Sequence, residues 1–266
     1  MTTRFALCGL LCFAGANGAL AESAATGPGP YVGLFGGAGS AISANLEQKG
    51  AVILNPSPTR LLPIKASGAT GGAHVSFGGA QVGYSWDRWG SAQSKWGLKP
   101  AVELEGIYLG KHAPTGEMPV MPRALGMQYV TIPMTTGVLL ANAVFTMQTP
   151  YSDTVFPYLG VGAGIASISI KGSDSANPSE PGINHFNSDP DASASAFALQ
   201  LKAGLKAQMN KHLSLFAEYR YLSINSTNYT FGATDYPGVH LPTKPWNVSL
   251  GRQHYNLFAV GLQYAF

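Results

Sequence analysis

The sequence predicts an all-β fold, an eight-stranded antiparallel up-and-down transmembrane β-barrel. Three observations support this prediction. Eight segments alternate apolar with polar or small side chains at a period of two residues, the connections between them alternate between long and short, and the chain begins with a segment typical of exported proteins. A membrane barrel needs an even number of tilted strands of about 9 to 11 residues, with short turns at one end and longer loops at the other.

The start of the chain resembles a secretory signal peptide. Arg4 precedes an apolar run over residues 5–16, and residues 19–21 (ALA) form an A-x-A cleavage site. The alternative, a transmembrane helix, needs about 20 apolar residues, and this run is shorter. We therefore expect a cleaved signal peptide at residues 1–21 and one barrel domain over residues 22–266.

The composition favours a membrane protein over a soluble one. Only 11% of the residues are charged, where soluble domains have about 25%. The formal net charge of +3 is too small to indicate a nucleic-acid partner. Both cysteines, Cys8 and Cys12, lie in the predicted signal peptide, so the exported chain has no disulfide and no thiol nucleophile.

The eight predicted strands follow from the period-two alternation. They are residues 31–40, 73–86, 98–110, 128–146, 156–171, 195–208, 213–226 and 255–266. The long connections are residues 41–72, 111–127, 172–194 and 227–254, and the short ones are residues 87–97, 147–155 and 209–212. In a membrane barrel the long connections are the extracellular loops, and an even number of strands returns both termini to the periplasmic end.

The strands from 98–110, 195–208 and 213–226 carry charged residues on one parity only. In the 195–208 strand, for example, Leu199 and Leu201 alternate with Gln200 and Lys202. The strands of a soluble β-sandwich also have one solvent-exposed face and one buried face, so this pattern alone leaves both folds open. In a narrow barrel such charges face the lumen, where they must be paired. We predict a lumenal charge network made of Glu103, Glu105, Lys202, Lys206, Glu218 and Arg220; a proton relay or catalytic carboxylate pair is the functional alternative.

Pro133 interrupts the predicted strand over residues 128–146. Proline has no backbone N–H, and in a closed barrel every strand is hydrogen-bonded on both sides, so there is no edge strand that could accommodate the missing donor. We expect Pro133 to mark a bulge or the part of this strand that lies above the membrane.

Aromatic side chains gather around the short connections and the C-terminus, as expected for a membrane-interface girdle. The alternative is that they are ordinary core aromatics. The predicted girdle consists of Trp86, Trp89, Trp96, Tyr151, Tyr158 and Tyr264.

The last predicted strand ends the chain on an aromatic residue, Phe266. Phe258, Val260 and Leu262 share one parity, and the opposite parity is small or polar. An unpaired terminal strand would template aggregation. We therefore expect it to pair with the first strand, residues 31–40, and to close the barrel.

Four stretches resemble the opacity/OmpA-type outer-membrane β-barrel family of Gram-negative bacteria. They are YVGLFGGAG at 31–39, PYLGVGAGI at 157–165, LFAEYRYL at 215–222 and YNLFAVGLQYAF at 255–266. The resemblance implies a monomer in the outer membrane, in contact with lipid and lipopolysaccharide. It also implies that the barrel-assembly machinery recognises the terminal aromatic, Phe266. The family holds adhesins, surface antigens, ligand binders and structural barrels, so we expect a structural or surface-recognition role, with a host or other extracellular ligand bound by the loops.

Two other functions stay open, a small porin-like channel and a lipid A-modifying enzyme. His212, Ser214 and Glu218 resemble the His-x-Ser pair of deacylase barrels, although the acid lies closer in sequence than in those enzymes. The sequence indicates no catalytic site, no cofactor and no metal-ligand spacing. A metal or haem site assembled from histidines in or beside the loops stays open; these are His112, His185 and His240.

Overall fold

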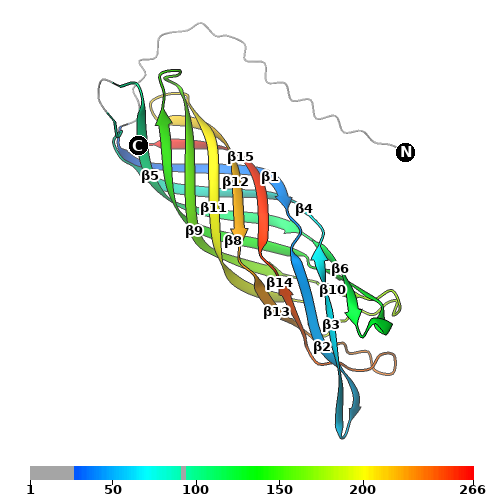
Figure 1. Ribbon diagram of the computed structural model, residues 1–266. Helices are drawn as coiled ribbons and strands as arrows, with labels where there is room; N and C mark the ends of the chain where they lie inside the picture. The colour runs from blue at the N-terminus through cyan, green and yellow to red at the C-terminus, as the bar shows by residue number, and fades with distance from the viewer. Residues whose placement is uncertain (1–26, 91–93) are drawn as a thin grey trace.

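The computed structural model describes residues 27–90 and 94–266 (Figure 1). The predicted signal peptide lies outside the described residues. Within the described ranges, no helix has the length and apolar character needed to cross a membrane. Strands dominate the chain, and a 3-10 helix, η1 (Arg123–Leu125), is a short exception.

Eight long strands form a closed antiparallel barrel in the order β1-β15-β12-β11-β9-β8-β5-β4. Their bounds are β1 Gly29–Ala41, β4 Ala73–Ser85, β5 Gly97–His112, β8 Met134–Gln148, β9 Val155–Ile170, β11 Ala192–Gln208, β12 Leu213–Ile224 and β15 Gln253–Ala265. The terminal strand β15 pairs with β1 from Ala265 opposite Tyr31 to Tyr255 opposite Ala41, and β1 also pairs with β4. The predicted strand number, topology and closure are confirmed.

Side chains alternate between the lumen and the outer surface along each barrel strand. On β11, Leu199 and Leu201 are about half exposed, whereas Gln200 and Lys202 are buried. On β15, Phe258 points outward in the same way. The apolar faces predicted from the sequence are therefore the outer faces of the barrel, and the polar or small faces line the lumen.

Two glycines show why the barrel can be narrow. A Cβ added to Gly37 on β1 would lie 1.9 Å from the carbonyl oxygen of Phe258, and one added to Gly164 on β9 would lie 1.8 Å from that of Leu139. Only glycine permits this close approach of neighbouring backbones. These positions let the sheet curve tightly.

The long connections, expected as loops, contain a second sheet, which we call the distal sheet. Its strands are β2 Asn45–Pro56, β3 Thr59–Thr70, β6 Thr115–Met121, β7 Met127–Thr131, β10 Asp174–Ala176, β13 Thr227–Phe231 and β14 Trp246–Leu250, in the order β10-β7-β6-β3-β2-β14-β13. Figure 1 shows this sheet extending the barrel at the end opposite the C-terminus, with the β2–β3 hairpin projecting furthest. The distal sheet is antiparallel throughout.

The distal sheet has an apolar core that continues the far part of the barrel lumen. Its inner face is buried and consists mainly of Leu46, Ile64, Met118, Val130, Tyr229, Phe231, Trp246, Val248 and Leu250. Pro133 lies between β7, which belongs to the distal sheet, and β8, which belongs to the barrel. The single strand predicted over residues 128–146 is therefore two strands, and Pro133 marks the point at which the chain passes from one sheet to the other.

The two edge strands of the distal sheet, β10 and β13, are joined by an irregular segment, residues 183–190, which we call the seam segment. His185 N donates to Ser175 O on the β10 side at 2.9 Å, and Gly232 N, just after β13, donates to Asp189 O at 2.8 Å. The rings of Phe186 and Phe231 stack at 4.4 Å between centroids. The seam segment thus hydrogen-bonds at both edges of the distal sheet, next to β10 and next to β13.

Candidate functional site

Five of the six charged residues predicted for the lumen form one ion-pair network. Lys202 Nζ lies 2.5 Å from Glu103 Oε2 and 3.0 Å from Glu105 Oε2. Arg220 Nη1 lies 2.6 Å from Glu105 Oε1, and its Nε donates to Glu218 Oε1 at 2.8 Å. Glu105 therefore bridges the two cations.

The network crosses the lumen. Glu103 and Glu105 lie on β5, and two strands, β8 and β9, separate β5 from the β11 strand that carries Lys202. The five side chains are all at most 6% exposed. Burying charge is unfavourable unless every charge is paired and hydrogen-bonded, and this arrangement meets that condition.

Neutral groups complete the coordination of the carboxylates. Tyr31 Oη donates to Glu103 at 2.8 Å, and Tyr158 Oη donates to Glu218 at 2.7 Å. Gln200 Nε2 donates to Glu105 at 3.0 Å. These bonds fix the positions of the acids and leave the lumen filled by side chains at this level.

Lys206 does not join the network as predicted. Among the described residues it forms no ion pair with a carboxylate. Its ammonium lies 5.7 Å from the ring centroid of Tyr31 and 5.5 Å from that of Tyr158. Because these two tyrosines take up the facing oxygens of Glu103 and Glu218, they separate Lys206 from the carboxylates, and cation–π attraction holds the ammonium instead.

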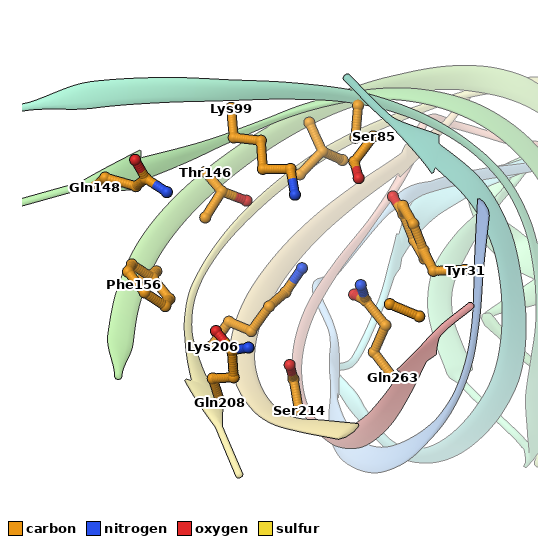
Figure 2. Close-up of a pocket in the computed structure, with 13 residues that line it drawn as sticks. Tyr31, Ser85, Lys99, Thr146, Gln148, Phe156, Lys206, Gln208, Ser214 and Gln263 are labelled. Atoms are coloured by element: carbon orange, nitrogen blue, oxygen red, sulfur yellow. The ribbon is translucent and has the colours of Figure 1, made fainter. Parts of the chain in front are cut away.

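Lys206 lines a cavity of about 50 Å³ at the end of the barrel that carries the short turns (Figure 2). Ser85, Lys99, Gln208 and Ser214 also contribute to its wall. Figure 2 shows the ammonium groups of Lys99 and Lys206 directed into this space from different strands. Beyond the charge network the lumen is lined mainly by buried apolar side chains, among them Leu109, Ile168 and Leu222, together with a hydrogen-bonded group of His112, Gln253 and Tyr255.

The structure does not assemble the deacylase-like trio. His212 Nδ1 lies 2.8 Å from Ala265 O, and its ring stacks on Tyr264 at the outside of the turn. Ser214 faces the lumenal cavity, and Glu218 is bound to Arg220 and Tyr158. No hydrogen bond joins His212 to Ser214 among the described residues, so the geometry of a serine nucleophile activated by a histidine is not formed here.

A comparison with protein-family models matches residues 5–266 to the outer membrane protein beta-barrel domain. The chain belongs to this family. Its place is therefore the outer membrane, and the outward apolar side chains of the barrel contact lipid.

The barrel is similar to solved outer-membrane structures at low sequence identity. Neisserial surface protein A is 14% identical (TM-score 0.35, covering 89% of this chain and 97% of that one), and OprG from Pseudomonas aeruginosa is 15% identical (TM-score 0.41, 90% and 96%). The outer membrane protease OmpT from Escherichia coli is 8% identical (TM-score 0.35, 92% and 100%). A search of curated proteins found no match.

The prediction that Tyr158 belongs to the aromatic girdle of this outer-membrane barrel is wrong. Tyr158 is 5% exposed and faces the lumen, because it has the parity of the lumenal residues on β9 and its hydroxyl binds Glu218. The other girdle residues are exposed at the end with the short turns: Trp86, Trp89, Trp96, Tyr151 and Tyr264. Trp96 and Tyr151 pack edge to face at 5.9 Å. Their role at the membrane interface stays a prediction.

The distal sheet brings together residues that sequence spacing did not connect. His185 lies in the seam segment, His240 lies in the connection between β13 and β14, and both contact Glu180. We call these three residues the His–Glu cluster. The signal available in the sequence was weak, because the two histidines are far apart along the chain and only the pairing of the distal strands makes them neighbours.

Proposed function

We propose that this outer-membrane barrel is a surface-recognition protein, similar in role to an adhesin or surface antigen, and that the distal sheet carries the recognition surface. In this proposal the end with the short turns faces the periplasm and the distal sheet faces the outside. The observation that carries the proposal is the distal sheet itself. It is a folded extension whose buried apolar face continues the barrel interior, and it projects the β2–β3 hairpin away from the barrel (Figure 1).

The end of this hairpin and the neighbouring loop expose apolar side chains, which we call the tip surface: Leu54, Leu61, Val239 and Leu241. Their exposed fractions range from 42% for Leu54 to 77% for Val239. The two segments are adjacent, because Ile53 pairs with Leu61 and its N–H donates to Pro242 O at 2.8 Å. Apolar side chains grouped on a surface outside the membrane are typical of a protein-binding site.

The lumen supports recognition over conduction. A channel needs a continuous aqueous path, whereas here ion pairs cross the lumen and buried, mainly apolar side chains fill it beyond them. We expect planar bilayers containing the refolded protein to show negligible conductance. A stable conductance that falls when the lumen is blocked would favour the porin-like alternative.

The test is binding of the refolded protein in lipid vesicles to a panel of immobilised extracellular-matrix glycoproteins, complement proteins and haem. We expect the wild-type protein to bind a protein of this panel and Leu61→Glu combined with Leu241→Glu to abolish that binding. Asn228→Glu, which adds a charge to an exposed position of β13 away from the tip surface, is the matched control. Retained heat-modifiable gel mobility shows that each variant is folded. Absence of binding by the wild type, or equal binding by the tip variant and the control, contradicts the proposal.

A further inference from the structure

The His–Glu cluster joins two connections of the distal sheet. Glu180 Oε2 lies 3.0 Å from His185 Nε2, and Glu180 Oε1 lies 3.3 Å from His240 Nε2. One ligand atom from each of the three residues lies within 4.8 Å of the others. The side chains of His185 and His240 are 7% and 13% exposed, and that of Glu180 is 36% exposed, so the cluster is reached from the carboxylate side.

The hydrogen bonds of the two imidazoles define which nitrogen carries the proton. His185 Nδ1 lies 2.7 Å from Ser175 O, and His240 Nδ1 lies 2.6 Å from Leu241 O. A carbonyl oxygen can only accept, so each Nδ1 must donate an N–H. Gln128 Nε2, which lies 3.2 Å from His185 Nδ1, is itself a donor and has the Ser175 hydroxyl as its acceptor at 2.8 Å.

In a neutral imidazole with Nδ1 protonated, Nε2 presents a lone pair. Both Nε2 atoms face the carboxylate of Glu180, which also only accepts. Three electron-rich groups therefore converge without a donor between them. Such an arrangement is repulsive unless the imidazoles take additional protons or a cation lies between the groups.

We propose that Glu180, His185 and His240 bind a divalent transition-metal ion of the zinc class. Two imidazole nitrogens and one carboxylate form a common zinc ligand set with one further position open to water or another ligand. Zinc–ligand bonds of about 2.0 to 2.1 Å at tetrahedral angles place neighbouring ligand atoms roughly 3.3 Å apart, close to the 3.0 Å between His185 Nε2 and Glu180 Oε2, and one ligand atom from each residue lies within 4.8 Å of the others. Calcium and magnesium prefer oxygen ligands and fit this set poorly.

The surroundings are those of an organised metal site. Main-chain carbonyl groups hold each Nδ1–H, which fixes the ring orientation and makes Nε2 a better ligand. The ring of Trp246 packs edge to face against His185 at 6.0 Å. Gln48 and Asn177 line the adjoining cavity of about 50 Å³, which leaves room for a water ligand.

A metal here would act as a clip on the seam of the distal sheet. Glu180 and His185 follow β10, and His240 belongs to the connection between β13 and β14. The main-chain bonds of the seam segment already join these regions, and a shared metal ion would add a strong cross-link. This inference does not depend on the recognition role, because metal binding is measured without any extracellular partner.

The test uses the full chain refolded in detergent micelles and titrated with Zn²⁺ against a competing chelator. Co²⁺ serves as an optical probe of tetrahedral coordination. We expect one Zn²⁺ per chain. Affinity should fall in His240→Ala and in Glu180→Gln by more than the 10- to 100-fold that loss of an outer-shell partner produces. His212→Ala, at the opposite end of the molecule, is the matched control and should bind as the wild type does.

Hydrogen exchange gives an independent readout. With free Zn²⁺ at 100 times its dissociation constant, exchange in residues 183–190 should slow about 100-fold if opening of the seam releases the metal. This slowing should be absent in His240→Gln, the variant used if His240→Ala does not show heat-modifiable mobility. Failure to bind one Zn²⁺, or equal affinity in the wild type and the cluster variants, overturns the proposal. Nitrogen NMR showing both Nε2 atoms protonated at pH 7, with no response to Zn²⁺, overturns it in favour of an imidazolium–carboxylate cluster.

Discussion

Replacing Glu105 by alanine should destabilise the barrel more than almost any other single change in the lumen. Glu105 is fully buried and accepts hydrogen bonds from Lys202, Arg220 and Gln200 at 3.0, 2.6 and 3.0 Å. In Glu105→Ala each cation retains one carboxylate partner, Glu103 for Lys202 and Glu218 for Arg220. Among the described residues, Glu105 is the one carboxylate that binds both network cations, so the variant removes one contact from each of them.

The expected magnitude follows from this arrangement. Removing one member of a buried ion pair costs about 3 to 5 kcal/mol when the remaining charge is left without a partner. Because Lys202 and Arg220 each keep one carboxylate in Glu105→Ala, we expect the lower end of that range. Glu105→Gln preserves the volume and one acceptor but removes the charge. It should therefore lose less free energy of unfolding than Glu105→Ala, and the difference separates packing from charge.

Urea unfolding of the refolded protein in lipid vesicles, followed by tryptophan fluorescence, measures these differences. Glu117→Ala is the control, because Glu117 is exposed on β6 and accepts a single bond from Tyr129 at 3.2 Å. A double variant that also replaces Arg220 by methionine should lose less stability than the sum of the two single variants, because both single variants break the same Glu105–Arg220 ion pair. A Glu105→Ala midpoint equal to that of Glu117→Ala would refute the reasoning.

Four further outcomes are expected. Tyr158→Phe, which removes the 2.7 Å bond to Glu218, should cost about 1.5 to 3 kcal/mol in the same urea assay; an unchanged midpoint would contradict the lumenal placement. Hydrogen bonds from Lys49 and Lys65 lower the pKa of Glu47 below its ordinary value of 4.5. The stabilisation that Glu47 gives the β2–β3 hairpin is therefore complete above pH 4.5 and is lost as the pH falls through the lowered pKa of the folded state. Hydrogen exchange in the hairpin should speed up over this pH range in the wild type, and not in Glu47→Gln. Leu201→Arg, on the outer face of β11, should cost about 2 to 4 kcal/mol if the position lies at the bilayer midplane, and no cost would place it outside the lipid. Phe266→Ala should reduce the heat-modifiable fraction in cell envelopes, whereas equal yields would remove Phe266 as an assembly signal.

The barrel could be predicted from the sequence because its strands obey one simple rule over a long distance. On β11 and β15 every second side chain faces lipid, so alternation persists for more than ten residues and gives both the strand and its orientation. The lumenal ion pairs followed from the same rule. Two acids on β5 and two cations on β11 and β12 can only neutralise one another when all face inward.

The distal sheet could not be predicted in this way, because its strands are short or contain proline. The strands β7, β13 and β14 have five residues each. Pro63 and Pro119 lie within β3 and β6 and resemble loop residues in sequence. The structure tolerates them because Pro63 lies beyond the paired part of β6, and the β3–β6 ladder is interrupted at Pro119.

The errors at Tyr158 and Lys206 have one physical cause. Near the end of a strand, the parity of a residue still shows whether its side chain faces the lumen or the lipid. An aromatic residue there nevertheless has the composition expected of the membrane-interface girdle, and a lysine has the charge expected of the lumenal ion-pair network. What decides the outcome is the length of the side chain relative to its partners. The hydroxyl of Tyr158 reaches Glu218, and in doing so its ring becomes the contact surface for Lys206.

The continuity of the two interiors bears on how the distal sheet could recognise a partner. Its core is continuous with the lumen, and the hairpin strands β2 and β3 are paired at their base with β14 and β6, which orders the base of the hairpin relative to the barrel. A rigid surface loses less conformational freedom on binding, which saves about 0.5 to 1.5 kcal/mol for each side chain already ordered. Because the connection that contains His240 also carries Val239 and Leu241 of the tip surface, a metal ion at the His–Glu cluster would order this surface directly. Metal binding and partner binding are then expected to strengthen each other, as linkage requires when both favour the same ordered state.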